Sequence, residues 1–137
     1  GHFVTCFLGH YNYSSRILKY VNAGHNPPYL ISENGTIQEL CDGCFMLGAF
    51  PEIPQINTGK AYITSPKNKL FMFTDGITET MNPKQEEYGE ERLKSFLGKT
   101  INEELKINLA NLIIEIDDFK KEGSYHDDLT LFSVRFR

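Results

Sequence analysis

The first forty residues carry apolar and aromatic positions in short runs that are typical of β-strands. Residues 3–11 form one such run. Residues 16–22 alternate between the two faces of a strand and follow a short polar stretch, which suits a hairpin. Two further apolar segments flank Asn34-Gly35, a dipeptide that strongly favours a tight turn. This part of the sequence therefore predicts two consecutive β-hairpins.

Glycine and proline then interrupt the strand pattern. Residues 41–59 are rich in both and show no sustained period, which predicts a long loop with small local structure. A short strand is expected at residues 61–64. Residues 70–74 form a dense apolar run of strand length, and this run ends abruptly at Asp75-Gly76.

The hydrophobic period changes to that of a helix in the second half of the chain. Residues 88–97 place three apolar side chains on one helical face. Apolar residues recur at helical spacing from 105 to 119, with Asn102 as the expected N-cap. Residues 129–136 again alternate as a strand. No repeat or linker interrupts the chain, so residues 1–137 are expected to belong to one domain.

The composition is that of a folded protein with a mildly acidic surface. The 137 residues are 40% hydrophobic and carry 18 acidic against 14 basic side chains, a formal net charge of −4. Nucleic acids and anionic membranes attract clustered Lys and Arg, so neither is an expected partner. No apolar run approaches the ~18–20 residues that span a bilayer, and no signal sequence opens the chain. A cytoplasmic location is therefore expected.

The three cysteines are too few for a disulfide framework. Cys41 and Cys44 form a C-x-x-C motif that could be a redox pair or half of a zinc site. A second ligand pair is missing from the sequence, and the motif falls in an expected loop rather than at the start of a helix. Structural or incidental cysteines are the favoured interpretation.

Two histidines lie near residues of chemical interest. His25 stands in a Gly-Asn-Pro context at the end of a strand, where it could act as a general acid. A hydrogen-bonded turn is the favoured interpretation for His25. His126 precedes Asp127 and could add to a metal site, although a solvated neighbour is favoured.

Acidic residues stand at the ends of two expected strands. Asp75 ends one strand, and Asp127-Asp128 opens the last. The carboxylates meet at one sheet edge if the two strands are antiparallel, and they lie at opposite ends if the strands are parallel, as a helical crossover suggests. Converging carboxylates suit a hard cation such as Mg²⁺ or Mn²⁺, which can activate water and neutralise a phosphoryl oxygen. The alternative is that both sites are plain turns, which spacing alone favours.

Five short motifs occur in one order along the chain. They are residues 22–28 (NAGHNPP), 46–48 (MLG), 74–79 (TDGITE), 88–93 (YGEERL) and 127–130 (DDLT). With these motifs the chain resembles the PPM-type serine/threonine phosphatases of the bacterial SpoIIE-like branch, which includes sigma-factor regulator phosphatases. The resemblance covers nearly the whole chain, from about residue 3 to residue 136.

This resemblance implies an α+β fold, an α-β-β-α sandwich of antiparallel sheets with a metal centre at one edge. Family members are hydrolases that use a two-metal centre of Mn²⁺ or Mg²⁺. A metal-activated water releases phosphate from phosphoserine or phosphothreonine without a covalent enzyme intermediate. By motif, Asp75 and Asp127 match metal ligands, and Asp128, Gly76 and His25 are candidate accessory residues.

The family's other metal ligands, on strands near the domain's N-terminus, have no counterpart in this sequence. The resemblance therefore implies that residues 1–137 are the C-terminal part of one phosphatase domain, with the N-terminal strands missing, and that the chain is inactive alone. Unpaired sheet edges are then expected on residues 3–8, 70–73 or 129–136, and with them a homodimer.

The substrate implied by the resemblance is a phosphorylated partner protein in bacterial signal transduction, such as an anti-sigma-factor antagonist. A second hypothesis stays open beside this one. The chain could be a non-catalytic, phosphatase-like module that binds a partner or senses a signal, because a fold alone does not establish an activity.

Overall fold

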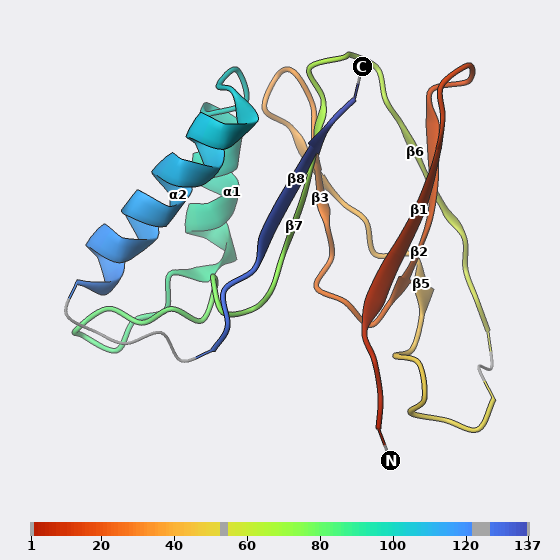
Figure 1. Cartoon of the computed structure of the whole chain (residues 1–137), viewed down its shortest axis with the longest axis horizontal. Helices are drawn as coiled ribbons and strands as arrows, with labels where there is room; N and C mark the ends of the chain where they lie inside the picture. The colour runs from red at the N-terminus through yellow and green to blue at the C-terminus, as the bar shows by residue number, and fades with distance from the viewer. Residues whose placement is uncertain (1, 53–54, 122–126, 137) are drawn as a thin grey trace. The chain divides into compact units, whose positions relative to one another are not determined.

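The computed structural model describes residues 2–52, 55–121 and 127–136, so His126 lies outside the described residues. The chain divides into two compact units. The first consists of Gly1–Pro28 and Glu39–Thr64, and the second of Tyr29–Gln38 and Ser65–Arg137. Figure 1 shows the helices and strands of both units with their labels.

The first unit is built on a sheet with β2 at its centre. Its strands are β1 (Cys6–Asn12), β2 (Ile17–Ala23), β5 (Gly43–Cys44) and β6 (Gly59–Tyr62). β1 and β2 form an antiparallel hairpin in which Cys6 faces Ala23, which confirms the first predicted hairpin. On the other side of β2, β6 pairs antiparallel and β5 pairs parallel with successive segments of the strand. β5 is thus the small local structure within the predicted loop at residues 41–59, and the last residue of that range begins β6.

The second unit contains a sheet in the order β4-β3-β7-β8. Its strands are β3 (Tyr29–Ile31), β4 (Ile37–Glu39), β7 (Lys69–Phe73) and β8 (Leu131–Arg135). β3 and β4 are neighbours joined through the Asn34-Gly35 turn, where the Ser32 N–H donates to the Thr36 carbonyl at 2.8 Å. This confirms the second predicted hairpin. β7 pairs antiparallel with both β3 and β8.

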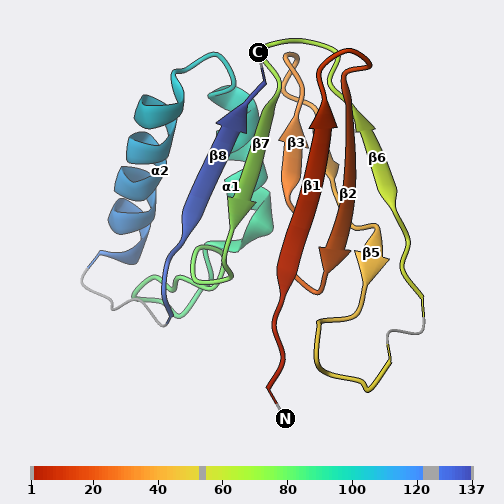
Figure 2. The same cartoon turned by 45° about the vertical axis from the view of Figure 1, so that its right-hand side comes forward.

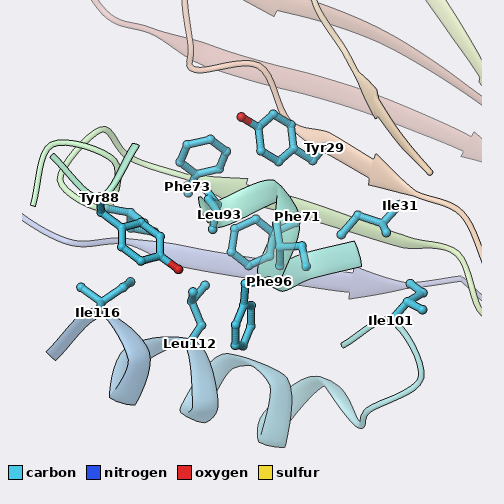
Figure 3. Close-up of a cluster of buried hydrophobic side chains, with 12 residues drawn as sticks. Tyr29, Ile31, Phe71, Phe73, Tyr88, Leu93, Phe96, Ile101, Leu112 and Ile116 are labelled. Carbon is cyan, nitrogen blue, oxygen red and sulfur yellow. The ribbon is translucent and has the colours of Figure 1, made fainter. Parts of the chain in front are cut away.

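Two helices, α1 (Gly89–Lys99) and α2 (Leu105–Lys120), lie on one side of this second sheet (Figure 1). Between sheet and helices is the main hydrophobic core, which Figure 3 shows in close-up. The core takes its side chains from β3, β7, both helices and their connections, namely Tyr29, Ile31, Phe71, Phe73, Ile77, Tyr88, Leu93, Phe96, Leu97, Ile101, Leu112 and Ile116. The described residues therefore form an α+β fold of two sheets and two helices, as predicted.

The start of α2 differs from the prediction of an Asn102 cap. The residue before the helix is Glu104, in extended backbone, and its side chain makes no capping hydrogen bond. The Lys69 ammonium is fully buried and donates to the Thr100 carbonyl at 3.3 Å and the Glu103 carbonyl at 2.8 Å. These tertiary bonds hold the connection between the helices in a turn, so the helix begins two residues later than the local sequence indicates.

β1 and β8 are edge strands of their sheets, as two of the three candidate segments predicted, and the other edge strands among the described residues are β4, β5 and β6. Leu8 on β1 is 70% exposed, and Phe132 on β8 is 53% exposed. The third candidate, residues 70–73, is wrong as an edge, because β7 lies between β3 and β8 and Phe71 is buried. Among the described residues, no helix is long and apolar enough to cross a membrane.

Candidate active site

The orientation of β7 and β8 determines whether the acidic strand ends meet. These two strands are antiparallel, and Phe73 at the end of β7 faces Leu131 at the start of β8. Asp75 and the Asp127-Asp128 pair therefore lie at the same edge of the sheet. Figure 2 shows the end of β7 beside the start of β8. The parallel alternative, in which these residues lie at opposite ends, is excluded.

Thr74 continues the contact between the two strand ends beyond the regular sheet. Its main-chain N–H donates to the Thr130 carbonyl at 3.2 Å, and its hydroxyl oxygen Oγ1 accepts the Thr130 N–H at 3.0 Å. The same hydroxyl donates to the Asp128 carbonyl at 2.9 Å. The residue before Asp75 is thus hydrogen-bonded directly to the segment that carries Asp127 and Asp128.

Gly76 is packed against the same segment. A Cβ atom on Gly76 would lie 2.7 Å from the Asp128 carbonyl oxygen and 3.2 Å from that of Asp127. Real Cβ atoms essentially never approach an oxygen at the shorter of these distances. Glycine is therefore the residue that lets the two backbones approach this closely, and Gly76 acts here through its lack of a side chain.

After Asp75 the chain forms a tight turn. The Asp75 carbonyl accepts the Glu79 N–H at 2.8 Å and the Thr78 hydroxyl at 3.1 Å. The fully buried Thr80 donates its hydroxyl to the Gly76 carbonyl at 2.7 Å. Side-chain and main-chain donors together fix the backbone on the C-terminal side of Asp75.

The turn is anchored on the start of α1. The Tyr88 N–H donates to the Thr80 carbonyl at 2.8 Å, and the Gly89 N–H donates to the Thr78 carbonyl at 2.9 Å. Tyr88 is itself buried, and its hydroxyl donates to Glu115 on α2 at 2.6 Å. Burial and this bond raise the pKa of Tyr88. The acidic edge is therefore attached to the helical layer as well as to the sheet.

The three carboxylates at this edge face solvent. Asp75, Asp127 and Asp128 are exposed, and Asp127 Oδ1 accepts the N–H of Asp128 at 2.7 Å. None of the ion pairs found between described residues involves them. The edge is thus a concentration of negative charge that no Lys or Arg of the described ranges neutralises by direct pairing.

Oxygen-only donors of this kind fit a hard divalent cation such as Mg²⁺ or Mn²⁺. Within residues 2–52, 55–121 and 127–136, however, no three His, Cys, Asp or Glu side chains are close enough together to hold a metal. The edge therefore fits part of a coordination shell, and water or further protein ligands must complete it. Mg²⁺ commonly keeps several waters, which makes two carboxylates a sufficient protein contribution from one side.

His25 belongs to the first unit, whereas Asp75 and Asp127 belong to the second. The main-chain N–H of His25 donates to Asn22 Oδ1 at 2.8 Å, and Asn22 Nδ2 donates back to the His25 carbonyl at 2.8 Å. Gly24 between them has a φ of 72°, which glycine adopts without strain. The favoured prediction of a hydrogen-bonded turn at His25 is therefore confirmed.

The C-x-x-C motif has a different geometry from a redox centre. Cys41 is exposed, Cys44 is partly buried, and neither forms a disulfide within the described part of the chain. Gly43 and Cys44 form β5, a short extended strand beside β2. Thioredoxin-like chemistry places such a pair at the start of a helix, so the structure argues against that chemistry and supports structural or incidental cysteines, the favoured interpretation.

Sequence reasoning gave no separate role to Thr74 and Thr80. Both hydroxyls hold main-chain groups of the acidic edge in place. The available signal was the position of a threonine immediately before the acidic residue at a strand end. That signal became interpretable only once the strand opposite Thr74 was known.

A family model identifies the family of this chain, and a curated relative matches over nearly the same residues. The family model of stage II sporulation protein E (SpoIIE) matches residues 1–137. The protein IcfG of Synechocystis sp. is 29% identical over 133 residues, which are 96% of this chain and 20% of that protein.

Solved structures show the same fold. The PP2C domain of SiaA from Pseudomonas aeruginosa superimposes with a TM-score of 0.85 at 18% identity, over 98% of this chain and 52% of that one. The Mn-presoaked phosphatase domain of SpoIIE from Bacillus subtilis superimposes with a TM-score of 0.69 at 18% identity, over 96% of this chain and 56% of that one. The chain thus spans about half the length of these PP2C domains.

Proposed function

The chain belongs to the SpoIIE family, and we propose that it is part of a serine/threonine phosphatase domain that removes phosphate from a phosphorylated protein. One observation carries this proposal. The antiparallel pairing of β7 and β8 brings Asp75 of the T-D-G motif to the same sheet edge as Asp127 of the D-D-x-T motif. Residues far apart in the sequence thereby lie at the same end of one strand pair, which supports their assignment to a single site.

In this proposal Asp75 and Asp127 hold a divalent cation, Mn²⁺ or Mg²⁺, through their carboxylate oxygens. When bound, such an ion would activate a water molecule and offset the charge that develops on a phosphoryl oxygen. The exposure of both carboxylates leaves room for a phosphorylated side chain to approach from solvent. Asp128 and Gly76 support the site, Asp128 as an adjacent carboxylate and Gly76 by allowing close backbone contact.

Two carboxylates are fewer ligands than a two-metal centre needs. The family resemblance assigns the other ligands to a part of the domain that matches none of this sequence, and the solved domains are about twice as long as this chain. We therefore propose that residues 1–137 form the C-terminal part of a single phosphatase domain and are inactive without the remainder.

The proposed substrate is a regulatory phosphoprotein in the bacterial cytoplasm, such as an anti-sigma-factor antagonist. One of the matched solved structures contains RsbU and RsbW domains of a single Mycobacterium tuberculosis protein, with a TM-score of 0.72. The exposed edges of β1 and β8 are the proposed surfaces for pairing with a second copy.

The test is Mn²⁺-dependent release of phosphate from a phosphoserine peptide by the full-length protein. Loss of a residue that only hydrogen-bonds a metal ligand typically lowers activity roughly 10–100-fold. Asp75→Asn and Asp127→Asn should each lower the rate by more than this, because each would remove a ligand itself. Asp118→Asn is the matched control, because Asp118 is an exposed carboxylate on α2 and stands outside the acidic edge. Equal rates in all three variants would contradict the assignment.

The second candidate function is a non-catalytic module that binds a partner protein. The observation in its favour is that the described residues contain no group of three metal-binding side chains. Full-length protein that binds its phosphoprotein partner but releases no phosphate with either cation would support this alternative.

A further inference from the structure

Thr74 occupies an unusual place in the ladder between β7 and β8. Its N–H makes the bond to the Thr130 carbonyl that an antiparallel ladder would make. The return bond is different, because the Thr130 N–H donates to the Thr74 hydroxyl at 3.0 Å. A side-chain oxygen thus takes the place that a main-chain carbonyl holds in a regular ladder.

The same hydroxyl also uses its hydrogen. A threonine hydroxyl has one hydrogen to donate and two lone pairs to accept with. Thr74 Oγ1 donates that hydrogen to the Asp128 carbonyl at 2.9 Å while it accepts the Thr130 N–H. The Thr74 side chain therefore binds two main-chain groups of the opposite segment, the Asp128 carbonyl and the Thr130 N–H.

These bonds connect the two acidic segments at their nearest points. Thr74 is covalently joined to Asp75, and the carbonyl that it binds belongs to Asp128. The contact at Gly76 keeps the same two backbones close from the other side of Asp75. Beyond the β7–β8 ladder and the Thr74 N–H bond, the Thr74 hydroxyl and the absence of a side chain at Gly76 thus help to set the position of Asp127-Asp128 relative to Asp75.

We propose that Thr74 is a positioning residue whose hydroxyl sets the distance between the Asp75 carboxylate and the Asp127-Asp128 carboxylates. The inference rests on the proposed function and adds a residue that the motif comparison leaves without a role. Threonine suits this task because its β-branched side chain has a restricted χ1 angle, which aims the hydroxyl.

The role of Thr74 is separable from a contribution to folding. Both of its side-chain bonds lie in an exposed part of the molecule, where water can replace a lost partner. Removal of the hydroxyl should therefore change global stability little. Metal ligands, in contrast, depend on the groups that orient them, and loss of such a group typically weakens metal binding about 10–100-fold.

The experiment measures Mn²⁺ affinity of the full-length protein by titration calorimetry, together with hydrogen exchange of the Thr130 amide without metal. Thr74→Val removes the hydroxyl and keeps the shape, and Thr74→Ser keeps the hydroxyl. Thr100→Val is the matched control, because the Thr100 hydroxyl also makes two bonds, to Phe96 and Asn108, at the opposite end of α1.

We expect Thr74→Val to bind Mn²⁺ about 10–100-fold more weakly and to lose protection of the Thr130 amide. Thr74→Ser should keep most of the Mn²⁺ affinity and most of the protection of the Thr130 amide. Thr100→Val should change neither the affinity nor the protection. Wild-type affinity in Thr74→Val, while Asp75→Asn has lost binding, would overturn the positioning role and leave the proposed function standing. Equal weakening in Thr74→Val and Thr100→Val would reduce Thr74 to a structural role. Absence of Mn²⁺ binding by the wild type would overturn both.

Discussion

Replacing Gly76 by alanine is the most direct test of how closely the two acidic segments must approach. The new methyl carbon would lie 2.7 Å from the Asp128 carbonyl oxygen, whereas ordinary contacts begin at 3.4 Å. The segments must therefore separate by about 0.7 Å if the contact is to relax by translation alone. Both nearest atoms belong to the main chain, so no side chain can rotate out of the way.

The expected cost to stability follows from the packing. Overpacking of this kind usually destabilises a protein by about 1–3 kcal/mol, and the hydrogen bonds of Thr74 and Thr80 resist the displacement from both sides. The effect on activity should be larger, because a misplacement of about 1 Å at a reacting centre can cost roughly 100-fold in rate. The free energy of unfolding comes from urea titration, and the rate from Mn²⁺-dependent phosphate release by the full-length protein.

Gly9→Ala is the matched control for Gly76→Ala. Gly9 lies on β1, and the atoms that its Cβ would meet are the ends of the Leu18 and Phe7 side chains at 3.3 and 3.4 Å. These side chains can move slightly, so we expect little loss of stability or rate. The reasoning about the acidic edge is refuted if Gly76→Ala keeps wild-type stability and a wild-type rate.

Two further predictions concern the core of the second unit and a buried tyrosine of the first unit. Leu112→Ala should destabilise the protein by about 2–5 kcal/mol in urea titration, because Leu112 is fully buried among the core side chains between sheet and helices. Ile114→Ala is the control and should cost much less, because Ile114 lies on the same helix but is exposed. Burial, and then the hydrogen bond to Asp42 at 3.0 Å, raise the pKa of Tyr20 from 10.0 to about 12. The folded state favours the neutral phenol of Tyr20. The contribution of Tyr20 to the free energy of unfolding is therefore complete below pH 10 and is lost as the pH rises through about 12. The difference in unfolding free energy between wild type and Tyr20→Phe should shrink over that range, and a constant difference would contradict the cause given.

Local pattern was sufficient to predict most of the elements, because each strand and helix buries one face and the period of its apolar residues reports that face. Local pattern failed where a distant residue determines the backbone. β5 exists because Gly43 and Cys44 pair with β2, and no period within two residues can signal that pairing. Asn102 was wrong as a cap because buried Lys69 holds the Thr100 and Glu103 carbonyls.

The candidate site depends on the same distinction between local and tertiary information. The sequence placed Asp75 and Asp127 at strand ends but left two strand orientations open. A helical connection between strands ordinarily produces a parallel crossover, which would have separated the carboxylates. Two helices join β7 to β8, and the chain returns antiparallel beside the strand that it left.

This antiparallel return also explains why a threonine at position 74 and a glycine at position 76 suit the acidic edge. Two chain segments that come from opposite directions must be joined where their regular hydrogen bonding ends. The Thr74 hydroxyl connects the segments by a hydrogen bond to the Asp128 carbonyl. Gly76 has no side chain that would force the segments apart. The residues between and beside the carboxylates thus determine whether two exposed aspartates are ordinary turn residues or neighbours that can bind one cation. The variants at positions 74 and 76 separate these two cases, because they alter the distance between the aspartates without removing any carboxylate.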